Sequence, residues 1–353
     1  MAAFTTTLGQ RGYVYGKTRA EVARSLHDKL KATQDGIPIP GDALTLEKFL
    51  TQWLADTVPN RVRPVTLVSY SGLIRLHVIP ELGRVRLARL TPEQVQGLLN
   101  KKLTAGMSPR SVELIRAVLR QALGHALRWN LVGRNVAALT TRPRSNRQEI
   151  RPLDAEQAQR LLEAVRGDRL EALYTVALAL GVRQGEALAL RWDDVDFEHA
   201  LVRVRRSLTR IAGKFKLEEP KTPSSRRTLG PLPPVLMETL RAHRQRQTEE
   251  RLAAPTWWEW DLVFCSPSGS PMHSSTVTKA FQAQIAAAGL PRQTFHDLRH
   301  ACASLLMAQG VNPRVVMEIL GHTTIATTLD VYSHVLQSTQ GAALAGLAAS
   351  LVD

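Results

Sequence analysis

Two short stretches interrupt the helical patterning of this 353-residue chain and divide it into parts that must each build a core. Residues 36–41 read Gly-Ile-Pro-Ile-Pro-Gly, and Gly and Pro are the strongest interrupters of helices and strands. Residues 142–151 begin Arg-Pro-Arg-Ser-Asn-Arg and contain few apolar side chains. Because the chain is long enough for two domains, we expect residues 42–141 and 152–336 to fold separately, behind a small segment at 1–35.

The composition favours helices and a reducing compartment. Hydrophobic residues make up 44% of the chain and aromatic residues only 5%, so the core must consist mainly of Leu, Val and Ala. Two cysteines, without ligand spacing to histidine, argue against both a disulfide scaffold and a zinc site. No apolar run is long enough for a signal peptide or a membrane span, so we expect a cytoplasmic protein.

The charge indicates a polyanionic partner. The formal net charge is +15, and residues 42–141 alone carry 14 Lys/Arg against 6 Asp/Glu. Nucleic acid is the commonest such partner, whereas a membrane surface would call for a basic amphipathic helix with bulky apolar anchors, and none stands out. The basic stretch 142–151 is either part of a clamp around a duplex or a solvated hinge, and the sequence does not separate the two.

Residues 42–141 have the pattern of a helical bundle. Apolar residues recur at helical spacing behind Thr45, a typical N-cap residue. Further helices are expected at about 64–77, 92–103 and 109–128, the last behind a capping Ser108 with Pro109 at its first position. A basic bundle of this kind is a candidate for gripping a DNA backbone.

Residues 152–336 predict an α+β domain, and the chain as a whole is expected to be mainly α. Asp154 should cap one helix, an apolar helix should run over 170–180, and helices should dominate from about 276 onward. A strand over 201–205 should pair with one over 226–229, in a small antiparallel sheet with residues 221–224 near the turn.

Two features bear on metal and nucleotide chemistry. The chain has no GxxxxGK[ST] loop, which argues against nucleotide hydrolysis. Its one dense carboxylate cluster, Asp193-Asp194-Val195-Asp196, should follow a helix ending at Trp192. Because the carboxylates of a metal site should converge from separate elements, we interpret this cluster as a structural turn.

The polar residues of the last sixty positions could meet at one phosphate. His296 and Arg299 are three residues apart and should share a helix face. His322 follows a Gly at the end of an apolar helical stretch, and Tyr332 lies in another. Upstream, the glycines of Gly181-Val182-Arg183-Gln184-Gly185 would let the backbone turn tightly and aim Arg183 into a cleft. An arginine fork suits two phosphate oxygens at once.

In this order and at these spacings, the motifs resemble the tyrosine recombinases, also called the phage integrase family. The run 179–196, the Pro220-Lys221-Thr222 segment, TFHDLRHACASLL, LGH and YSHV carry the resemblance through the catalytic half, and 42–141 is more weakly similar to the family's core-binding domain. The resemblance implies catalytic roles for Arg183, Lys221, His296, Arg299, His322 and the nucleophile Tyr332, and supporting roles for Glu186 and His300.

The resemblance also implies a mechanism. A free tyrosine has a pKa near 10, so its attack on a phosphodiester needs help. Arg183 and Arg299 would stabilise charge on the phosphoryl oxygens, and His322 would add a hydrogen bond. His296 would take the phenolic proton of Tyr332, and Lys221 would protonate the departing 5′-oxygen. One phosphodiester replaces another, so we expect no cofactor and no metal.

The implied partners are double-stranded DNA attachment sites and three further copies of the chain, in a tetramer on DNA. By analogy with the family, an excision factor or a host DNA-bending protein is a further candidate partner, and the protein would be nucleoid-associated. The Ala/Leu-rich tail, 337–353, should dock on a neighbouring subunit. The rival interpretations are a type IB topoisomerase and a DNA-binding protein without activity.

Two regions depart from the family or remain open. Integrases of this kind commonly begin with three strands and a helix that bind arm-type sites, but only GYVYGKTRAEV is recognisable, so residues 1–35 are expected to be reduced or to continue a domain that starts upstream. Tyr13 and Tyr15 could still lie on a small DNA-binding sheet. Trp257, Trp258 and Trp260 could stack on bases, although packing beneath a loop is the favoured interpretation.

Overall fold

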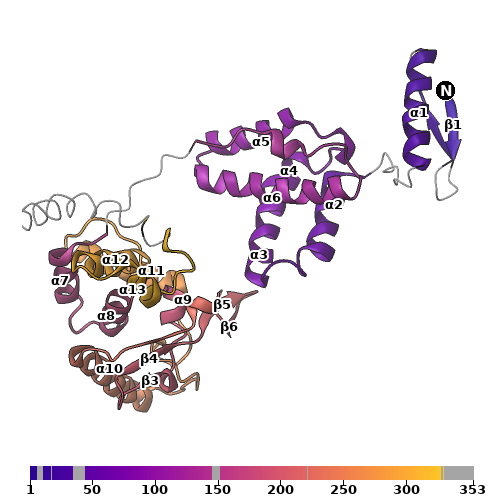
Figure 1. The fold of residues 1–353 in the computed structure, drawn as a ribbon. Helices are drawn as coiled ribbons and strands as arrows, with labels where there is room; N and C mark the ends of the chain where they lie inside the picture. Colours follow the sequence, from indigo (N-terminus) through magenta and orange to yellow (C-terminus); the bar gives the residue numbers. More distant parts are fainter. Residues whose placement is uncertain are drawn as a thin grey trace, which may run out of the picture. The chain divides into compact units, whose positions relative to one another are not determined.

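The computed structural model describes residues 1–5, 11–16, 18–34, 44–144, 152–220, 222–326 and 329. The chain divides into two compact units, Met1–Arg147 and Gln148–Asp353, each with a hydrophobic core of its own (Figure 1). Lys221, Tyr332 and the tail 337–353 lie outside the described residues, as do most of the two expected linkers.

The N-terminal segment is a two-stranded hairpin with a helix. Strand β1 (Ala2–Thr5) pairs antiparallel with β2 (Arg11–Val14), and α1 (Arg19–Gln34) packs on both strands. The expectation that the opening strands are missing was wrong for β1, because Ala-Ala-Phe-Thr is too short to show a clear alternation. Tyr13 and Tyr15 are exposed while Val14 between them is buried, as the alternation of a strand requires.

Residues 44–144 form the expected helical bundle. Its elements in chain order are α2 (Leu46–Gln52), η1 (Trp53–Thr57), α3 (Pro64–Leu73), η2 (Ile74–Val78), α4 (Ile79–Leu82), η3 (Leu87–Arg89), α5 (Pro92–Thr104), α6 (Pro109–Arg128) and η4 (Val136–Leu139).

The predicted caps of this bundle are confirmed. The Thr45 hydroxyl accepts a hydrogen bond from the Lys48 amide at 3.3 Å, and Ser108 does the same for Ser111 at 3.2 Å. Leu, Val, Ile and Ala side chains dominate the core, around a fully buried Trp53. Arg116, His125 and Thr140 are buried, while most of the other polar residues lie on the outer faces, where the basic surplus is available to a partner.

The second unit is mainly helical with small antiparallel sheets. Its elements are α7 (Ala155–Ala164), α8 (Glu171–Leu180), α9 (Gln184–Ala187), η5 (Trp192–Asp194), β3 (Val195–Asp196), β4 (Leu201–Val204), β5 (Ser207–Ile211), β6 (Lys214–Glu218), η6 (Pro223–Ser225), β7 (Arg227–Leu229), α10 (Pro234–Ala253), α11 (Ser274–Ala287), α12 (Asp297–Ala308) and α13 (Pro313–Leu320).

The predicted strand pair is confirmed, and a second hairpin was missed. β4 lies between β3 and β7, with Val202 opposite Leu229. The hairpin turn, however, lies at Ala212-Gly213 between β5 and β6, whereas Pro223 and Ser224 belong to the short helix η6. Both turn residues have positive φ, 48° and 85°, and an Ala in that conformation is a weak sequence signal compared with Asn or Gly.

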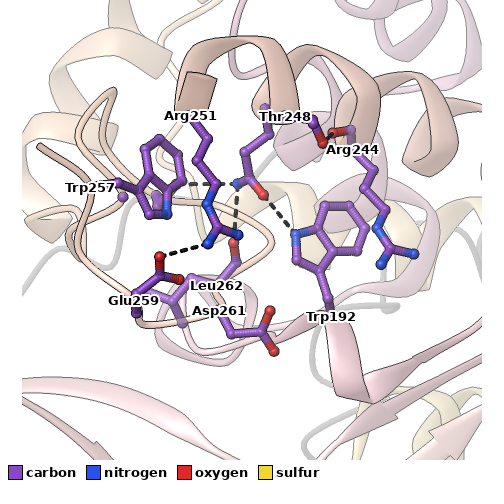
Figure 2. A pocket seen from close by; sticks show the side chains of 11 residues that line it. Trp192, Arg244, Thr248, Arg251, Trp257, Glu259, Asp261 and Leu262 are labelled. Carbon is purple, nitrogen blue, oxygen red and sulfur yellow. Dashed lines mark hydrogen bonds and ion pairs between the residues drawn. The ribbon is translucent and has the colours of Figure 1, made fainter. Parts of the chain in front are cut away.

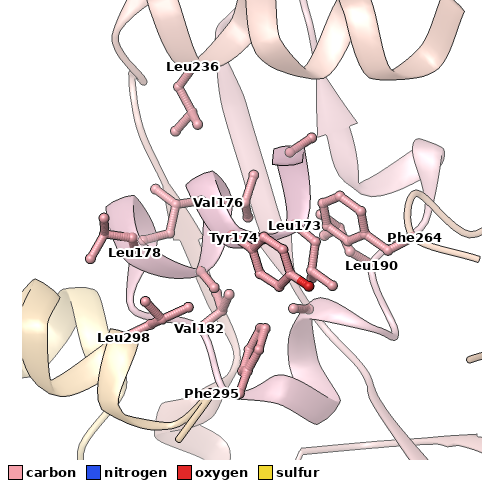
Figure 3. Close-up of a cluster of buried hydrophobic side chains, with 14 of the residues drawn as sticks. Leu173, Tyr174, Val176, Leu178, Val182, Leu190, Leu236, Phe264, Phe295 and Leu298 are labelled. Atoms are coloured by element: carbon pink, nitrogen blue, oxygen red, sulfur yellow. The ribbon is translucent and has the colours of Figure 1, made fainter. Parts of the chain in front are cut away.

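Helix α8 lies at the centre of the second unit's core and contacts α7, α10 and α12 (Figure 3). Leu173, Tyr174 and Val176 are almost fully buried, and Phe295 and Leu298 pack on them from the α12 side. Leu178 and Leu180, at the C-terminal end of α8, are buried as well. The residues that follow α8 therefore leave the core in a fixed direction.

Candidate active site

The C-terminal end of α8 places Arg183. Gly181 ends the helix in the left-handed conformation, with φ of 57°. A Cβ there would lie 2.3 Å from Cδ2 of Leu320, so the close approach of α13 also requires glycine. Arg183 is the extended N-cap of α9, and Gly185 lets α9 approach β5, where a Cβ would lie 2.7 Å from Oγ of Ser207. The two glycines of the motif therefore serve different contacts.

A buried carboxylate holds Arg183. Oε1 of Glu186 accepts a hydrogen bond from Nη1 of Arg183 at 2.7 Å, and Oε2 accepts one from the Arg183 backbone amide at 3.1 Å. Nη2 of Arg227 donates to the same Oε2 at 3.2 Å. Glu186 is buried and has two cationic partners, so its charge is compensated. Arg183 itself reaches solvent, which leaves it available to a ligand.

Arg299 approaches from α12 and is only 2% exposed. Its Nη1 donates to the carbonyl oxygen of Gly181 at 2.6 Å, while its Nη2 has no hydrogen-bond partner among the described residues. Burial, together with the charge of Arg183, lowers the pKa of Arg299 to about 9, so the side chain remains protonated at neutral pH. A buried, unsatisfied guanidinium nitrogen calls for an acceptor, and a phosphate oxygen is one.

His296 and His300 lie together at the start of α12. His296 is the N-cap, and the two rings contact edge to face with centroids 5.0 Å apart. Desolvation, then the neighbouring His300 and Arg299, lower the pKa of His296 although part of its side chain remains exposed. His296 is therefore neutral at pH 7, the state that can accept a proton.

His322 is fixed by the end of α13. Gly321 is left-handed with φ of 67°, its amide donates to the Glu318 carbonyl at 3.1 Å, and the His322 amide donates to Met317 at 3.0 Å. This pair of bonds is a Schellman motif. Desolvation and then the charges of Arg299 and Arg183 lower the pKa of His322 to about 3, so its ring is neutral.

The structure therefore brings six of the eight predicted site residues into one electrostatic cluster. They are Arg183, Glu186, His296, Arg299, His300 and His322. The remaining two, Lys221 and Tyr332, lie outside the described residues, but Thr222, next to Lys221, approaches the cluster. Oγ1 of Thr222 lies 2.9 Å from Oγ of Ser225, which in turn accepts a hydrogen bond from Nη1 of Arg183 at 3.2 Å.

Arg227 and Ser225 are members of this network that the sequence interpretation missed. β7 alternates, so Arg227 must lie on the same face as the buried Leu229. An arginine at an inward-facing strand position needs a buried partner. That signal was present in Arg226-Arg227-Thr228-Leu229 once the strand had been predicted.

The aspartate cluster is held by arginines. Asp194 is 1% exposed, accepts the Arg191 amide at 3.2 Å, and pairs with Arg206 at 2.8 Å. Asp196 accepts the His199 amide at 3.0 Å and pairs with Arg203 at 2.8 Å, and these two contacts, the amide first, lower the pKa of Asp196 to about 2. These partners confirm the structural interpretation. The preceding helix ends at Ala187, and not at Trp192, because Leu190–Trp192 pair with residues 261–263.

The tryptophans of the loop after α10 have separate environments. Trp257 lies against Gly269, where a Cβ would be 2.6 Å from the ring, and it lines a pocket of about 150 Å³ together with Trp192 (Figure 2). Nε1 of Trp192 donates to Gln247 at 2.7 Å within this pocket. Packing beneath the loop is thus confirmed for Trp257, whereas Trp258 is exposed.

No group of three His, Cys, Asp or Glu in the described part of the chain is placed to hold a metal ion. Among the helices that the structure describes, none is both long and apolar enough to cross a membrane.

A helical unit thus precedes a mixed unit in which two arginines and two neutral histidines form one cluster. Residues 151–339 match the family model of the phage integrase family, and residues 45–103 match the N-terminal SAM-like domain of phage integrases. The chain belongs to the phage integrase family, the tyrosine recombinases.

Relatives and solved structures agree with this assignment. The chain is 30% identical to a tyrosine recombinase XerC-like protein of Caldanaerobacter subterraneus subsp. tengcongensis, over 94% of this chain and 92% of that protein. It is 34% identical to an integrase of Streptomyces ambofaciens, over 90% and 83%.

The fold is that of solved integrases. The Tn1549 transposon integrase in complex with transposon right end DNA superposes with a TM-score of 0.72 at 21% identity, over 86% of this chain and all of that one. A lambda integrase from a tetramer bound to a Holliday junction gives 0.61 at 18% identity, over 94% and 91%. These likenesses confirm the predicted fold class.

Proposed function

We propose that the protein is a site-specific DNA recombinase that integrates and excises a mobile element through a 3′-phosphotyrosyl intermediate. The observation that carries the proposal is the unsatisfied Nη2 of the buried Arg299, in one cluster with Arg183 and the neutral rings of His296 and His322. An anion with several acceptor oxygens would complete this cluster, and a phosphodiester is such an anion.

The reaction follows from the charges. Tyr332 attacks the scissile phosphorus, a bond forms from its phenolic oxygen, and the bond to the 5′-oxygen breaks. Arg183 and Arg299 stabilise the negative charge on the non-bridging oxygens, and the neutral His322 donates a hydrogen bond to one of them. His296 accepts the phenolic proton and Lys221 supplies the proton to the 5′-oxygen. The reverse attack by a 5′-hydroxyl from another strand completes the exchange.

The chain's units have separate parts in this proposal. The basic helical bundle, residues 42–141, grips the DNA backbone, and residues 152–336 perform the chemistry. Backbone contacts of this kind fix register on the duplex and carry little sequence information. Residues 1–35 would bind additional sites on the element, through the exposed Tyr13 and Tyr15.

Four copies would assemble on two attachment sites in the nucleoid, in the cytoplasm, with the tail 337–353 docked on a neighbouring subunit. The lambda integrase tetramer bound to a Holliday junction supports that assembly by likeness of fold. An excision factor or a host DNA-bending protein would set the direction of the reaction.

A strand-exchange assay tests the function. Two labelled duplexes that carry the partner attachment sites are incubated with the protein in a buffer with chelator and without nucleotide. Recombinant duplexes are expected with the wild type and none with Tyr332→Phe. Relaxation of supercoiled DNA without any exchange, by the same preparation, would favour a topoisomerase and contradict the proposal.

A further inference from the structure

Arg227 uses all of its guanidinium nitrogens inside the protein. Nη2 donates to Oε2 of Glu186 at 3.2 Å, Nε to the carbonyl oxygen of Ile319 at 2.6 Å, and Nη1 to that of Ser225 at 3.0 Å. Its side chain is 7% exposed. Because each nitrogen already has an acceptor and little surface remains, Arg227 is not placed to contact a DNA phosphate, in contrast to Arg183.

These bonds close a ring through the site. Arg183 donates to Oε1 of Glu186 at 2.7 Å, Arg227 donates to the other oxygen, and Arg227 continues to Ile319 in the last turn of α13. Two residues later, the carbonyl oxygen of Gly321 accepts a bond from Nη2 of Arg183 at 3.4 Å. The ring thus joins α9, β7 and the C-terminal end of α13, which are distant in the sequence.

The C-terminal end of α13 leaves no room for a side chain at Gly321. A Cβ on Gly321 would lie 2.8 Å from the Ser224 carbonyl oxygen and 3.1 Å from Nη1 of Arg227. His322 follows immediately, and Tyr332 lies ten residues further along the sequence. A movement of Arg227 would therefore shift both the base of His322 and the carboxylate that orients Arg183.

We propose that Arg227 is a positioning residue. It holds the C-terminal end of α13, which carries His322, in place against the Arg183–Glu186 pair, and it does not contact the DNA. The inference rests on the proposed function of the site. A misplacement of about 1 Å in a catalytic group can cost about a hundredfold in rate, so loss of Arg227 should slow cleavage by about that factor. Binding of DNA, which depends on many backbone contacts, should change little.

The test measures single-turnover cleavage of a nicked attachment-site duplex at saturating DNA, together with the Kd for the same duplex and the thermal unfolding curve. Arg227→Lys keeps the charge but cannot reach three acceptors in fixed directions, so we expect its cleavage rate to fall about a hundredfold. The matched control is Arg226→Lys. Arg226 is adjacent, but its ion pair with Glu219 is exposed, and its rate should stay within threefold of the wild type.

A double-mutant cycle separates positioning from independent action. If Arg227 acts through Glu186, then Arg227→Lys combined with Glu186→Gln should be little slower than the slower single variant. Gly321→Ala, which disturbs the same junction without removing a charge, should reproduce the loss of rate with unchanged Kd.

Several results would overturn the proposal. These are a wild-type rate for Arg227→Lys, rate losses that multiply in the double variant, or a loss that merely follows the unfolded fraction at the assay temperature. Failure of the proposed function looks different, because then the wild type itself would give no cleavage.

Discussion

Nη1 of Arg299 donates a hydrogen bond of 2.6 Å to the carbonyl oxygen of Gly181, 118 residues earlier in the chain. This bond fixes the plane of the guanidinium and leaves Nη2 without a partner among the described residues. It therefore joins the two sequence motifs of the site and also orients the one nitrogen that a phosphate can use.

Replacement of Arg299 should affect cleavage far more than DNA binding. Arg299→Lys removes the guanidinium fork, which bonds Gly181 through one nitrogen and the substrate phosphate through another. We therefore expect the rate of single-turnover cleavage to fall by a factor of about 10²–10³. The matched control is Arg314→Lys on α13, where the exposed pair with Glu318 contributes little. Equal rates for Arg299→Lys and the wild type, at saturating DNA, would remove Arg299 from the proposed chemistry.

Gly181 should be intolerant of a side chain. Gly181→Ala meets both an unfavourable φ of 57° and Cδ2 of Leu320 at 2.3 Å, whereas Gly167→Ala, at φ of 81°, meets no atom within 4 Å. We expect Gly167→Ala to lower the free energy of unfolding by about 1 kcal/mol and Gly181→Ala by about 1–3 kcal/mol more. Chemical denaturation measures both, and equal losses would show that α13 moves away freely.

Replacement of the neighbouring Asp193 and Asp194 should lower the stability of the protein to different degrees and leave its activity unchanged. Asp194→Ala removes a buried partner of Arg206 and should cost about 1–3 kcal/mol, while Asp193→Ala, on a half-exposed side chain, should cost less than about 1 kcal/mol. Neither variant should change cleavage below its unfolding temperature, with or without chelator. Cleavage that needs a divalent ion and is lost in both variants would instead assign them a metal.

The stability of the second unit should fall as the pH is lowered through the ordinary pKa range of histidine. His322 has a folded pKa of about 3, whereas the unfolded chain restores a value near 6.5. Between these values the unfolded chain binds a proton that the folded protein does not, so stability present above about pH 6.5 is lost as the pH falls.

The variant His322→Gln isolates this effect. Its free energy of unfolding should decline less than that of the wild type between about pH 7.5 and pH 5, because one group no longer titrates. Urea titrations at the two pH values give the comparison. Parallel declines for the two proteins would mean that His322 keeps an ordinary pKa in the fold.

The sequence predicted the parts of the site whose neighbours are local. Gly321 ends α13 and places His322 by hydrogen bonds within five residues, so the pattern alone was sufficient. The same holds for the caps at Thr45, Ser108 and Asp154.

Features that depend on distant contacts were not predicted. Arg227 meets Glu186 and Ile319, 41 and 92 residues away, and nothing local in its strand marks those partners. The β5–β6 hairpin was missed because its Ala-Gly turn relies on a strained Ala212 that the pairing of the strands stabilises.

The most direct test of the central claim is to identify the residue that becomes joined to DNA. A nicked suicide duplex with the attachment site traps the covalent intermediate, because the short fragment carrying the 5′-hydroxyl diffuses away after cleavage. Protease digestion and mass spectrometry should then locate a nucleotide adduct on Tyr332, and Tyr332→Phe should give none. An adduct on another residue, or cleavage of the duplex without any covalent adduct, would contradict the account.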